Sequence, residues 1–119
     1  MKENPVQIKS YQFAVKIVKL YQKLVKERNE YDLFRQLLKS GTSIGANIEE
    51  AIGGQSKRDF IAKLSISYKE ARESKYWLNL LNDTGYLKKQ EFEELHQDCE
   101  ELLKIMFAII NSSKQNLKK

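Results

Sequence analysis

Apolar residues recur along the chain at alternating spacings of three and four, which is the period of an α-helix and not of a β-strand. Four such segments, separated by short polar stretches, predict helices at about residues 10–28, 33–53, 57–82 and 89–112. Amphipathic helices joined by short turns favour an all-α fold, an up-down-up-down antiparallel four-helix bundle, as a single domain over residues 1–119. Residues 1–8 are expected to form a loosely held polar arm, and residues 113–119 a frayed tail.

The predicted helices have recognisable ends. Ser10 and Asp32 are candidate N-caps of the first and second helices, because a short polar side chain can accept a hydrogen bond from a free amide of the first turn. The Gly53–Gly54 pair should end the second helix in a left-handed conformation, which glycine adopts without a Cβ penalty. Ser56, followed three residues later by Asp59, resembles a capping box at the start of the third helix.

Small residues interrupt the apolar faces of the second and third helices. Gly41 and Gly45 each cost about 1 kcal/mol relative to alanine inside a helix. They indicate either the close approach of a neighbouring helix or a break near Gly41, and periodicity leaves both open. In the third helix, Ser67, Ala71 and Ser74 form the middle of the inner face and would accept a bulky neighbour.

The composition narrows the class of protein. The chain has 119 residues, of which 41% are hydrophobic and 31% charged, as in a single soluble domain. Its one cysteine, Cys99, can form no disulfide within the chain. No apolar run approaches the roughly 20 residues that span a bilayer, and the first residues lack the apolar core of a signal peptide. A cytoplasmic protein is expected.

The net charge of +5 lies wholly in residues 1–40, which carry nine Lys and Arg against four Asp and Glu, whereas the rest of the chain is balanced. One side of the first helix carries Lys9, Lys16, Lys19, Lys23 and Lys26. Such a stripe could follow the phosphates of a nucleic acid. The candidate nucleic-acid-binding residues are Lys16, Lys19, Lys23, Lys26, Arg35 and Arg58. The alternative is a solvated face that keeps the protein soluble.

A polar motif in the second helix places Ser43, Asn47 and Glu50 on one side, and Glu73 of the third helix is expected to face them. We interpret this group as a polar network that fixes the register of the two helices, with a ligand site between them as the alternative. Tyr68, Tyr76, Trp77 and Tyr86 exceed what a small core needs, and outward-facing aromatic rings suit a subunit interface.

No catalytic, metal or cofactor site is expected. Glu93 and His96 have the Glu-x-x-His spacing of di-iron bundles, but such a site needs two of these motifs and the chain has one histidine. His96 and Cys99 share one helix with no oxyanion donors in view, so they make no nucleophilic pair. Gly41 to Gly45 lacks the Gly-Lys-Ser/Thr ending of a phosphate loop. An enzyme is therefore not expected.

The polar motif carries a family resemblance. The matching residues are Ser43, Ile44, Asn47, Ile48, Glu50, Ser56, Asp59, Phe60 and Glu73. They resemble the signature of the 23S rRNA intervening-sequence proteins (the S23 family), although Ala51 and Gly54 stand where that family commonly has glycine and a basic residue. The resemblance extends over about Tyr11 to Ile110 and implies antiparallel bundles that form homo-oligomers, with a pentameric ring as the expected arrangement. It also implies a nucleic-acid association, because a related bundle protein binds nucleic acid and a reverse transcriptase through a basic surface.

The sequence thus predicts a non-enzymatic, homo-oligomeric bundle protein that associates with RNA or DNA backbones through a basic face. The alternative is a scaffold for a protein partner with no nucleic-acid role. That alternative predicts an exposed apolar or aromatic patch around Tyr76.

Overall fold

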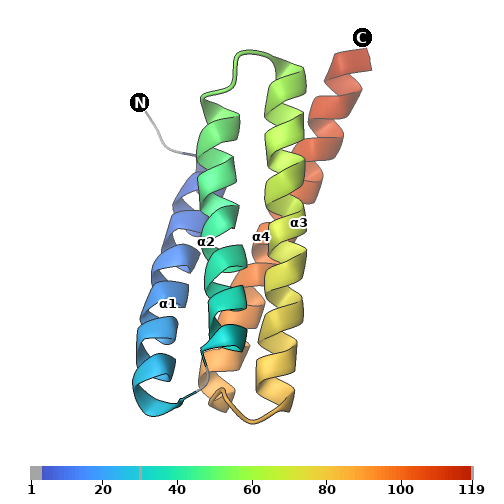
Figure 1. The fold of residues 1–119 in the computed structure, drawn as a ribbon. Helices are drawn as coiled ribbons and strands as arrows, with labels where there is room; N and C mark the ends of the chain where they lie inside the picture. The colour runs from blue at the N-terminus through green and yellow to red at the C-terminus, as the bar shows by residue number, and fades with distance from the viewer. Residues whose placement is uncertain (1–3, 30, 119) are drawn as a thin grey trace.

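The computed structural model describes residues 4–29 and 31–118, and in these ranges the chain forms four α-helices. They are α1 (Pro5–Glu27), α2 (Asp32–Ile52), α3 (Lys57–Asp83) and α4 (Lys89–Lys118). Successive helices run in opposite directions, and α4 crosses behind α2 and α3 toward the far end of α3 (Figure 1). The predicted up-down-up-down four-helix bundle is confirmed.

The first helix begins earlier than predicted. The Asn4 side chain accepts a hydrogen bond of 2.8 Å from the Gln7 N–H, and Pro5 occupies the first helical position, where its missing N–H costs nothing. Ser10 is not the N-cap, since it is buried inside α1 and its hydroxyl donates to the Gln7 carbonyl oxygen. The polar arm expected at residues 1–8 is therefore wrong for residues 4–8, and residues 1–3 lie outside the described residues.

The last helix continues past the end of its apolar pattern. It reaches Lys118, so the frayed tail predicted from residue 113 is wrong for residues 113–118, and residue 119 lies outside the described residues. The segment after Ile110 contains neither glycine nor proline, so nothing in its backbone chemistry stops a helix that is already formed.

The connections confirm one predicted cap and correct two others. The Ser56 hydroxyl accepts from the Asp59 N–H at 3.0 Å and caps α3 as predicted. At the start of α2, Tyr31 holds the N-cap position and Asp32 is the first helical residue. Gly53 follows α2 with a φ of −82°, so it does not adopt the left-handed conformation predicted there.

The left-handed glycine lies at the end of α3 instead. Gly85 has a φ of +85°, and it is the one glycine of the described residues with a positive φ. Its N–H donates to the Asn82 carbonyl oxygen, and the Tyr86 N–H donates to the Leu81 carbonyl oxygen at 2.9 Å. These two bonds satisfy carbonyls that the helix end leaves free, in the pattern of a Schellman motif.

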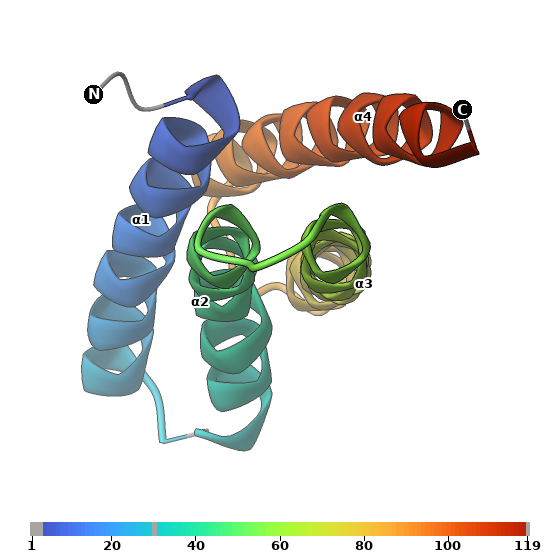
Figure 2. The ribbon, with the colours of Figure 1, turned by 90° about the horizontal axis from the view of Figure 1, so that it is seen from above.

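The central helix, α2, lies between α1 and α3 (Figure 2). A Cβ atom added at Gly41 would lie 3.0 Å from two carbons of the Ile17 side chain, and one added at Gly45 would lie 3.4 Å from the Ser10 carbonyl oxygen. Because α2 runs unbroken through both glycines, they mark the close approach of α1, and the predicted alternative of a break near Gly41 is wrong.

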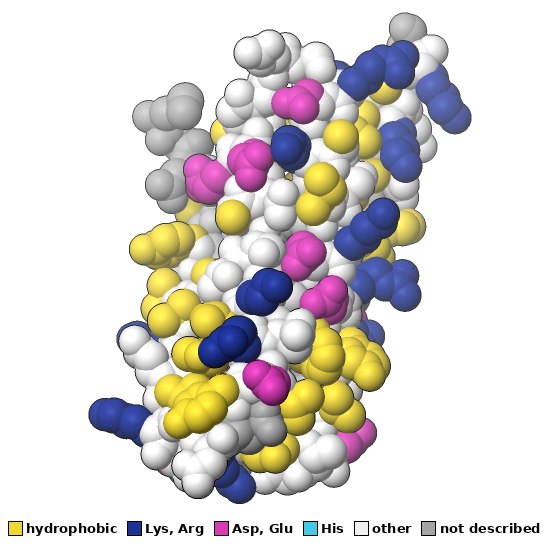
Figure 3. Space-filling model, viewed as in Figure 1, with side chains coloured by type: hydrophobic (Ala, Val, Ile, Leu, Met, Phe, Trp, Pro, Cys, Tyr) yellow, Lys and Arg dark blue, Asp and Glu magenta, His cyan; other side chains and the backbone are white. Residues whose placement is uncertain are grey.

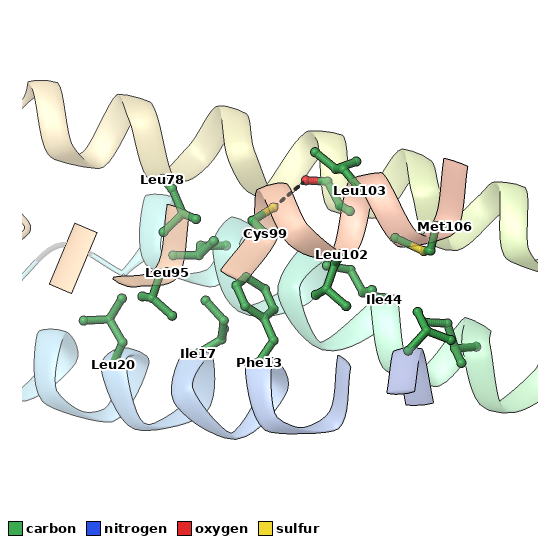
Figure 4. Packing of buried hydrophobic residues seen from close by; sticks show 14 of the residues in the cluster. Phe13, Ile17, Leu20, Ile44, Leu78, Leu95, Cys99, Leu102, Leu103 and Met106 are labelled. Atoms are coloured by element: carbon green, nitrogen blue, oxygen red, sulfur yellow. Dashed lines mark hydrogen bonds between the residues drawn. The ribbon is translucent and has the colours of Figure 1, made fainter. Parts of the chain in front are cut away.

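The core is apolar, with a few hydrogen bonds between helices. Figure 4 shows Phe13 and Ile17 of α1 directed toward the space that they share with Leu95 and Leu102 of α4. The small residues of α3 admit the backbones and small side chains of its neighbours. Their hydrogen bonds are Ser67 Oγ to the Ile44 carbonyl oxygen at 2.7 Å, Ser74 Oγ to Ser40 Oγ at 3.0 Å, and Cys99 Sγ to the Ala71 carbonyl oxygen at 3.2 Å.

Candidate nucleic-acid interface

The lysines of α1 divide into two sets, each spaced by seven residues. Lys9, Lys16 and Lys23 face α4, where the acidic side chains recur at spacings of three and four. Lys19 and Lys26 have no ion-pair partner among the described residues. Residues seven positions apart lie on nearly the same side of a helix. The contacts with α4 therefore distinguish Lys9, Lys16 and Lys23 from Lys19 and Lys26.

The first set forms a row of ion pairs with α4, here called the α1–α4 seam. Its pairs are Lys9 with Glu101, Lys16 with Glu94 at 2.8 Å and Asp98 at 2.7 Å, and Lys23 with Glu91 at 2.5 Å. Hydrogen bonds to Asp98 and Glu94 raise the pKa of Lys16, and the hydrogen bond to Glu91 raises the pKa of Lys23. Burial would raise the pKa of Glu91, but the hydrogen bonds from Lys23 and the Lys88 N–H outweigh it and lower that pKa.

The six predicted binding residues therefore do not form one surface. Lys16 and Lys23 have their charges compensated in the α1–α4 seam. Lys26 and Arg35 lie near the turn between α1 and α2, whereas Arg58 is in the first turn of α3 at the opposite end of the bundle (Figure 1). An extended basic face on α1 would need Lys16 and Lys23 to be available, and the carboxylates of α4 occupy them.

The charges of α4 are segregated along its length. Residues 89–101 contain six acidic residues and one lysine, whereas residues 102–118 contain three lysines and no acidic residue. Taking 100° per residue, Lys104, Lys114 and Lys118 share one exposed side of α4 with Phe107, which is 57% exposed. Within residues 4–29 and 31–118 these three lysines have no ion-pair partner, although Lys75 and, more weakly, Lys104 help to lower the pKa of Glu100.

Basic residues of α3 continue this surface. The Tyr68 and Phe107 rings pack 6.3 Å apart, and Lys75 pairs with Glu100 at 2.5 Å, so these contacts define the side of α3 that faces α4. Arg72 lies between Tyr68 and Lys75 along the axis of α3, and Arg58 lies four turns before Arg72, turned about 40° further toward solvent. The resulting α3–α4 basic face consists of Arg58, Arg72, Lys104, Lys114 and Lys118 beside the Tyr68–Phe107 pair. Figure 3 shows a row of Lys and Arg side chains down the right-hand edge of the molecule, on the side of α3 and α4.

Sequence reasoning missed this face apart from Arg58. Counts over residues 84–119 balance at six positive and six negative charges, and this balance hides the segregation within α4. The absence of any acidic residue after Glu101 is the signal that could have revealed the face.

The polar motif of α2 is arranged differently from its prediction. Ser43 Oγ donates to the Lys39 carbonyl oxygen, and Asn47 Nδ2 donates to the Ser43 carbonyl oxygen, so both bonds stay within α2. Glu50 reaches α3 through Lys63 at 3.1 Å, whereas Glu73 is exposed and accepts a bond from Trp77 of its own helix. The predicted network of these side chains between α2 and α3 is therefore wrong, and the serine bonds of the core occupy that interface instead.

Two exposed apolar regions accompany the charged surfaces. Ile8, Tyr11, Val15 and Val18 lie on one outward side of α1, with Tyr11 70% exposed, and are called the α1 apolar stripe. Figure 3 shows hydrophobic side chains along the edge of the molecule over α1. On α3, Tyr76 is 59% exposed and its ring packs edge-on against Trp77 at 5.0 Å.

The groups that could perform chemistry are few in the described part of the chain. Burial raises the pKa of Cys99 to about 12, so its thiol is protonated at neutral pH and is a poor nucleophile. His96 packs against Phe92 and lies 3.8 Å from Glu100. Among the described residues, no group of three or more His, Cys, Asp or Glu side chains could hold a metal ion, and no helix is long and apolar enough to cross a membrane.

Comparison with known proteins identifies the family. The family profile described as 23S rRNA-intervening sequence protein matches residues 2–108. The chain belongs to this family. A similar solved structure within it is the 1.70 Å crystal structure of a protein with unknown function, from the S23 ribosomal protein family, from Bacteroides thetaiotaomicron VPI-5482. The two chains are 50% identical with a TM-score of 0.86, over 88% of this chain and 97% of the other. None of the curated proteins compared with the chain matches it.

The family assignment confirms the resemblance seen in the sequence motif. Motif residues such as Ser56 and Asp59 specify the fold by capping α3. The solved relative has no assigned function, so the S23 family sets the architecture and leaves the partner to be inferred from surfaces.

Proposed function

We propose that this chain is a cytoplasmic, non-enzymatic protein that associates with RNA or DNA backbones through the α3–α4 basic face. The observation that carries the proposal is that Lys104, Lys114 and Lys118 form no ion pair among the described residues and stand on a helix segment without acidic residues. Cations in a row along a helix can follow successive phosphates, and each neutralised phosphate releases a counterion. This basic face replaces the α1 lysines as the preferred surface, because Lys16 and Lys23 are already paired.

The aromatic pair in the face favours unpaired nucleotides. Phe107 is exposed beside Tyr68, and an exposed ring offers a stacking surface to any base. Stacking on aromatic rings is a common way to bind single-stranded regions without reading a sequence. We therefore expect binding to single-stranded RNA or to loops, with little dependence on base sequence.

Fluorescence anisotropy with a labelled single-stranded RNA tests the proposal. For five neutralised phosphates, the logarithm of the affinity should fall with the logarithm of salt concentration with a slope of about −3.5 on a single strand. Lys104→Glu with Lys114→Glu should weaken binding at least about tenfold for every sequence. Lys19→Glu with Lys26→Glu is the matched control, since it changes charge equally on exposed positions of α1, and it should change affinity by less than about threefold.

An affinity that neither salt nor the α4 double variant changes would refute the proposal. A larger loss in the α1 control than in the α4 variant would instead return the interface to Lys19 and Lys26. Salt-independent retention together with a captured protein would favour the scaffold alternative, for which the exposed Tyr76–Trp77 pair is the candidate surface.

A second property, self-assembly, has its own support in the α1 apolar stripe. Four apolar side chains in succession on the outward side of a helix resemble a buried helix face, and large exposed patches mark interaction sites. We infer a homo-oligomer whose contact includes this stripe, with five copies as the number that the family resemblance implies. Tyr11→Glu with Val15→Glu should shift the mass in sedimentation velocity toward one chain, whereas Tyr76→Glu should not. A single-chain mass for the unaltered protein would refute the inference.

A further inference from the structure

An apolar cavity of about 380 Å³ lies at the end of the bundle that is uppermost in Figure 1. All four helices line it, through residues that include Val6 of α1, Ile48 of α2, Phe60 of α3, and Ile105 and Ile109 of α4. Val6 and Ile48 are buried core residues, so the cavity is continuous with the core. Phe60, Ile105 and Ile109 are partly buried and turn their remaining apolar surface toward the cavity.

The cavity lies beyond the last ion pair between α1 and α4. Toward this end of the bundle α4 runs beside α3 (Figure 1). Below this end the ion pairs of the α1–α4 seam hold the two helices together, and the uppermost of these pairs joins Lys9 to Glu101. Beyond the Lys9–Glu101 pair, Val6 of α1 and Ile105 of α4 line opposite sides of the cavity. No side chain of the described residues fills it.

The size of the cavity matches a ligand pocket rather than a packing defect. Protein interiors are close-packed and contain few voids larger than one water molecule. This cavity of about 380 Å³ is more than twice the roughly 150 Å³ that holds one benzene ring in a protein core, and it falls in the roughly 300–1,000 Å³ range of ligand pockets. A protein partner needs some 20–30 residues a side, far more than this concave site offers.

We propose that the cavity binds a small apolar anion, such as an aromatic or short-chain carboxylate or sulfonate. The apolar part occupies the space between Phe60 and Ile109, where a ring system or an acyl chain loses contact with water. The charge stays at the mouth near Lys57. Lys57 precedes Phe60 by three residues and Leu64 by seven, so it lies on the same side of α3 as these two lining residues.

Charge at the mouth favours an anion over a neutral ligand. Lys57 is exposed and, within the described ranges, has no ion-pair partner. Among the described residues, no acidic side chain lines the cavity. Residues 102–118 of α4 contain no acidic residue at all. The acidic Glu49 of α2 accepts a hydrogen bond from Gln7 on the α1 side, outside the lining.

Two fluorescent probes that share their rings but differ in charge test the proposal. They are the anion 1-anilinonaphthalene-8-sulfonate and the neutral N-phenyl-1-naphthylamine. Both should bind the full chain saturably with one site per chain. Ile109→Trp should weaken both at least about tenfold by filling the space, whereas Ala108→Trp, at the exposed neighbouring position, should leave both within about twofold. Ile105→Phe is a second, smaller filling substitution, and circular dichroism verifies that each variant keeps its helix content.

Lys57→Glu tests the contribution of the positive charge separately from that of the apolar cavity. It should weaken the anionic probe by about fivefold and leave the neutral probe unchanged, because only the sulfonate interacts with residue 57. Equal binding by Ile109→Trp and the unaltered protein, or equal losses in Ile109→Trp and Ala108→Trp, would overturn the pocket. Equal responses of the two probes to Lys57→Glu would refute the preference of the cavity for an anionic ligand.

Discussion

The two sides of α1 are held by different interactions. Toward α2, the Ile17 side chain lies against Gly41, so this contact is close and apolar. Toward α4, Lys16 extends across the interface to Glu94 and Asp98 and remains partly exposed to water. Close apolar packing depends on shape, whereas ion pairs in contact with solvent depend on salt and pH.

This difference shows how a charged stripe should be interpreted. Lysines on one side of an amphipathic helix have the same spacing whether they face solvent or a neighbouring acidic helix. The partner decides their role, and for Lys16 and Lys23 the partner is the acidic half of α4. Lys104 and Lys114 belong to a helix segment with no acidic residues, so their field reaches solvent.

The largest effect is expected on the α2 side of α1. In Gly41→Leu the new Cβ would lie 3.0 Å from two carbons of Ile17, so α1 has to move or Ile17 has to change conformation. Overpacking of this kind should lower the free energy of unfolding by about 2–3 kcal/mol, measured by urea denaturation. Ala46→Leu, at an exposed position of the same helix, should change it by less than about 0.5 kcal/mol. An undiminished stability in Gly41→Leu would show that the close approach of α1 is unimportant.

A smaller effect is expected on the α4 side. Lys16→Glu places a third carboxylate beside Glu94 and Asp98 and replaces two attractions by repulsions. Because these side chains are substantially exposed, the loss of unfolding free energy should be only about 1 kcal/mol, and it should shrink in high salt. Lys104→Glu is the control without an ion pair, and it should be neutral within about 0.5 kcal/mol.

Restoring the pair with opposite charges sharpens this test. The double variant Lys16→Glu with Asp98→Lys should recover part of the lost stability, because the interaction energy belongs to the pair. Equal losses in Lys16→Glu and Lys104→Glu would mean that the seam contributes nothing specific.

The sequence predicted the architecture well for a physical reason. A helical period repeated over some twenty residues leaves little freedom of interpretation, and Gly53 and Ser56 bound the turn between α2 and α3. The start of α1 was missed because it depends on the burial of Val6 against the core, and no helical pattern of apolar residues marks the segment around it. The end of α4 was missed because no apolar pattern marks it, and the segment up to Lys118 has no glycine or proline to stop the helix.

The candidate site was harder to predict because it depends on pairing between helices. Spacing alone places Lys16 and Lys19 on similar sides of α1, and only the position of α4 shows that the first is paired and the second is not. The core hydrogen bond from Ser67 to the Ile44 carbonyl oxygen also depends on the register of two helices, so the polar pattern of Ser43 pointed to the wrong partners.

The smallest effect concerns pH, and its direction follows from the seam. The pKa of Glu91 is lower in the folded protein than its usual value of 4.5, so its contribution to stability is present above the unfolded pKa and is lost as the pH falls through the folded one. The pKa of Lys16 is raised above 10.5, so its contribution is present below that value and is lost as the pH rises through the folded pKa. The seam should therefore weaken at both extremes of pH.

Glu91→Gln isolates the acidic limb of this profile. The variant keeps the shape of the side chain but cannot gain a proton, so its urea midpoint should fall less than that of the unaltered protein between about pH 6 and pH 3. Glu93→Gln is the matched control on the same turn of α4, since Glu93 is exposed and has no ion-pair partner in the described ranges. Because Glu91 and Lys23 are partly exposed, the difference should be small. Parallel acid profiles for Glu91→Gln and the unaltered protein would show that the Glu91–Lys23 pair contributes no pH-dependent stability on the α4 side of α1.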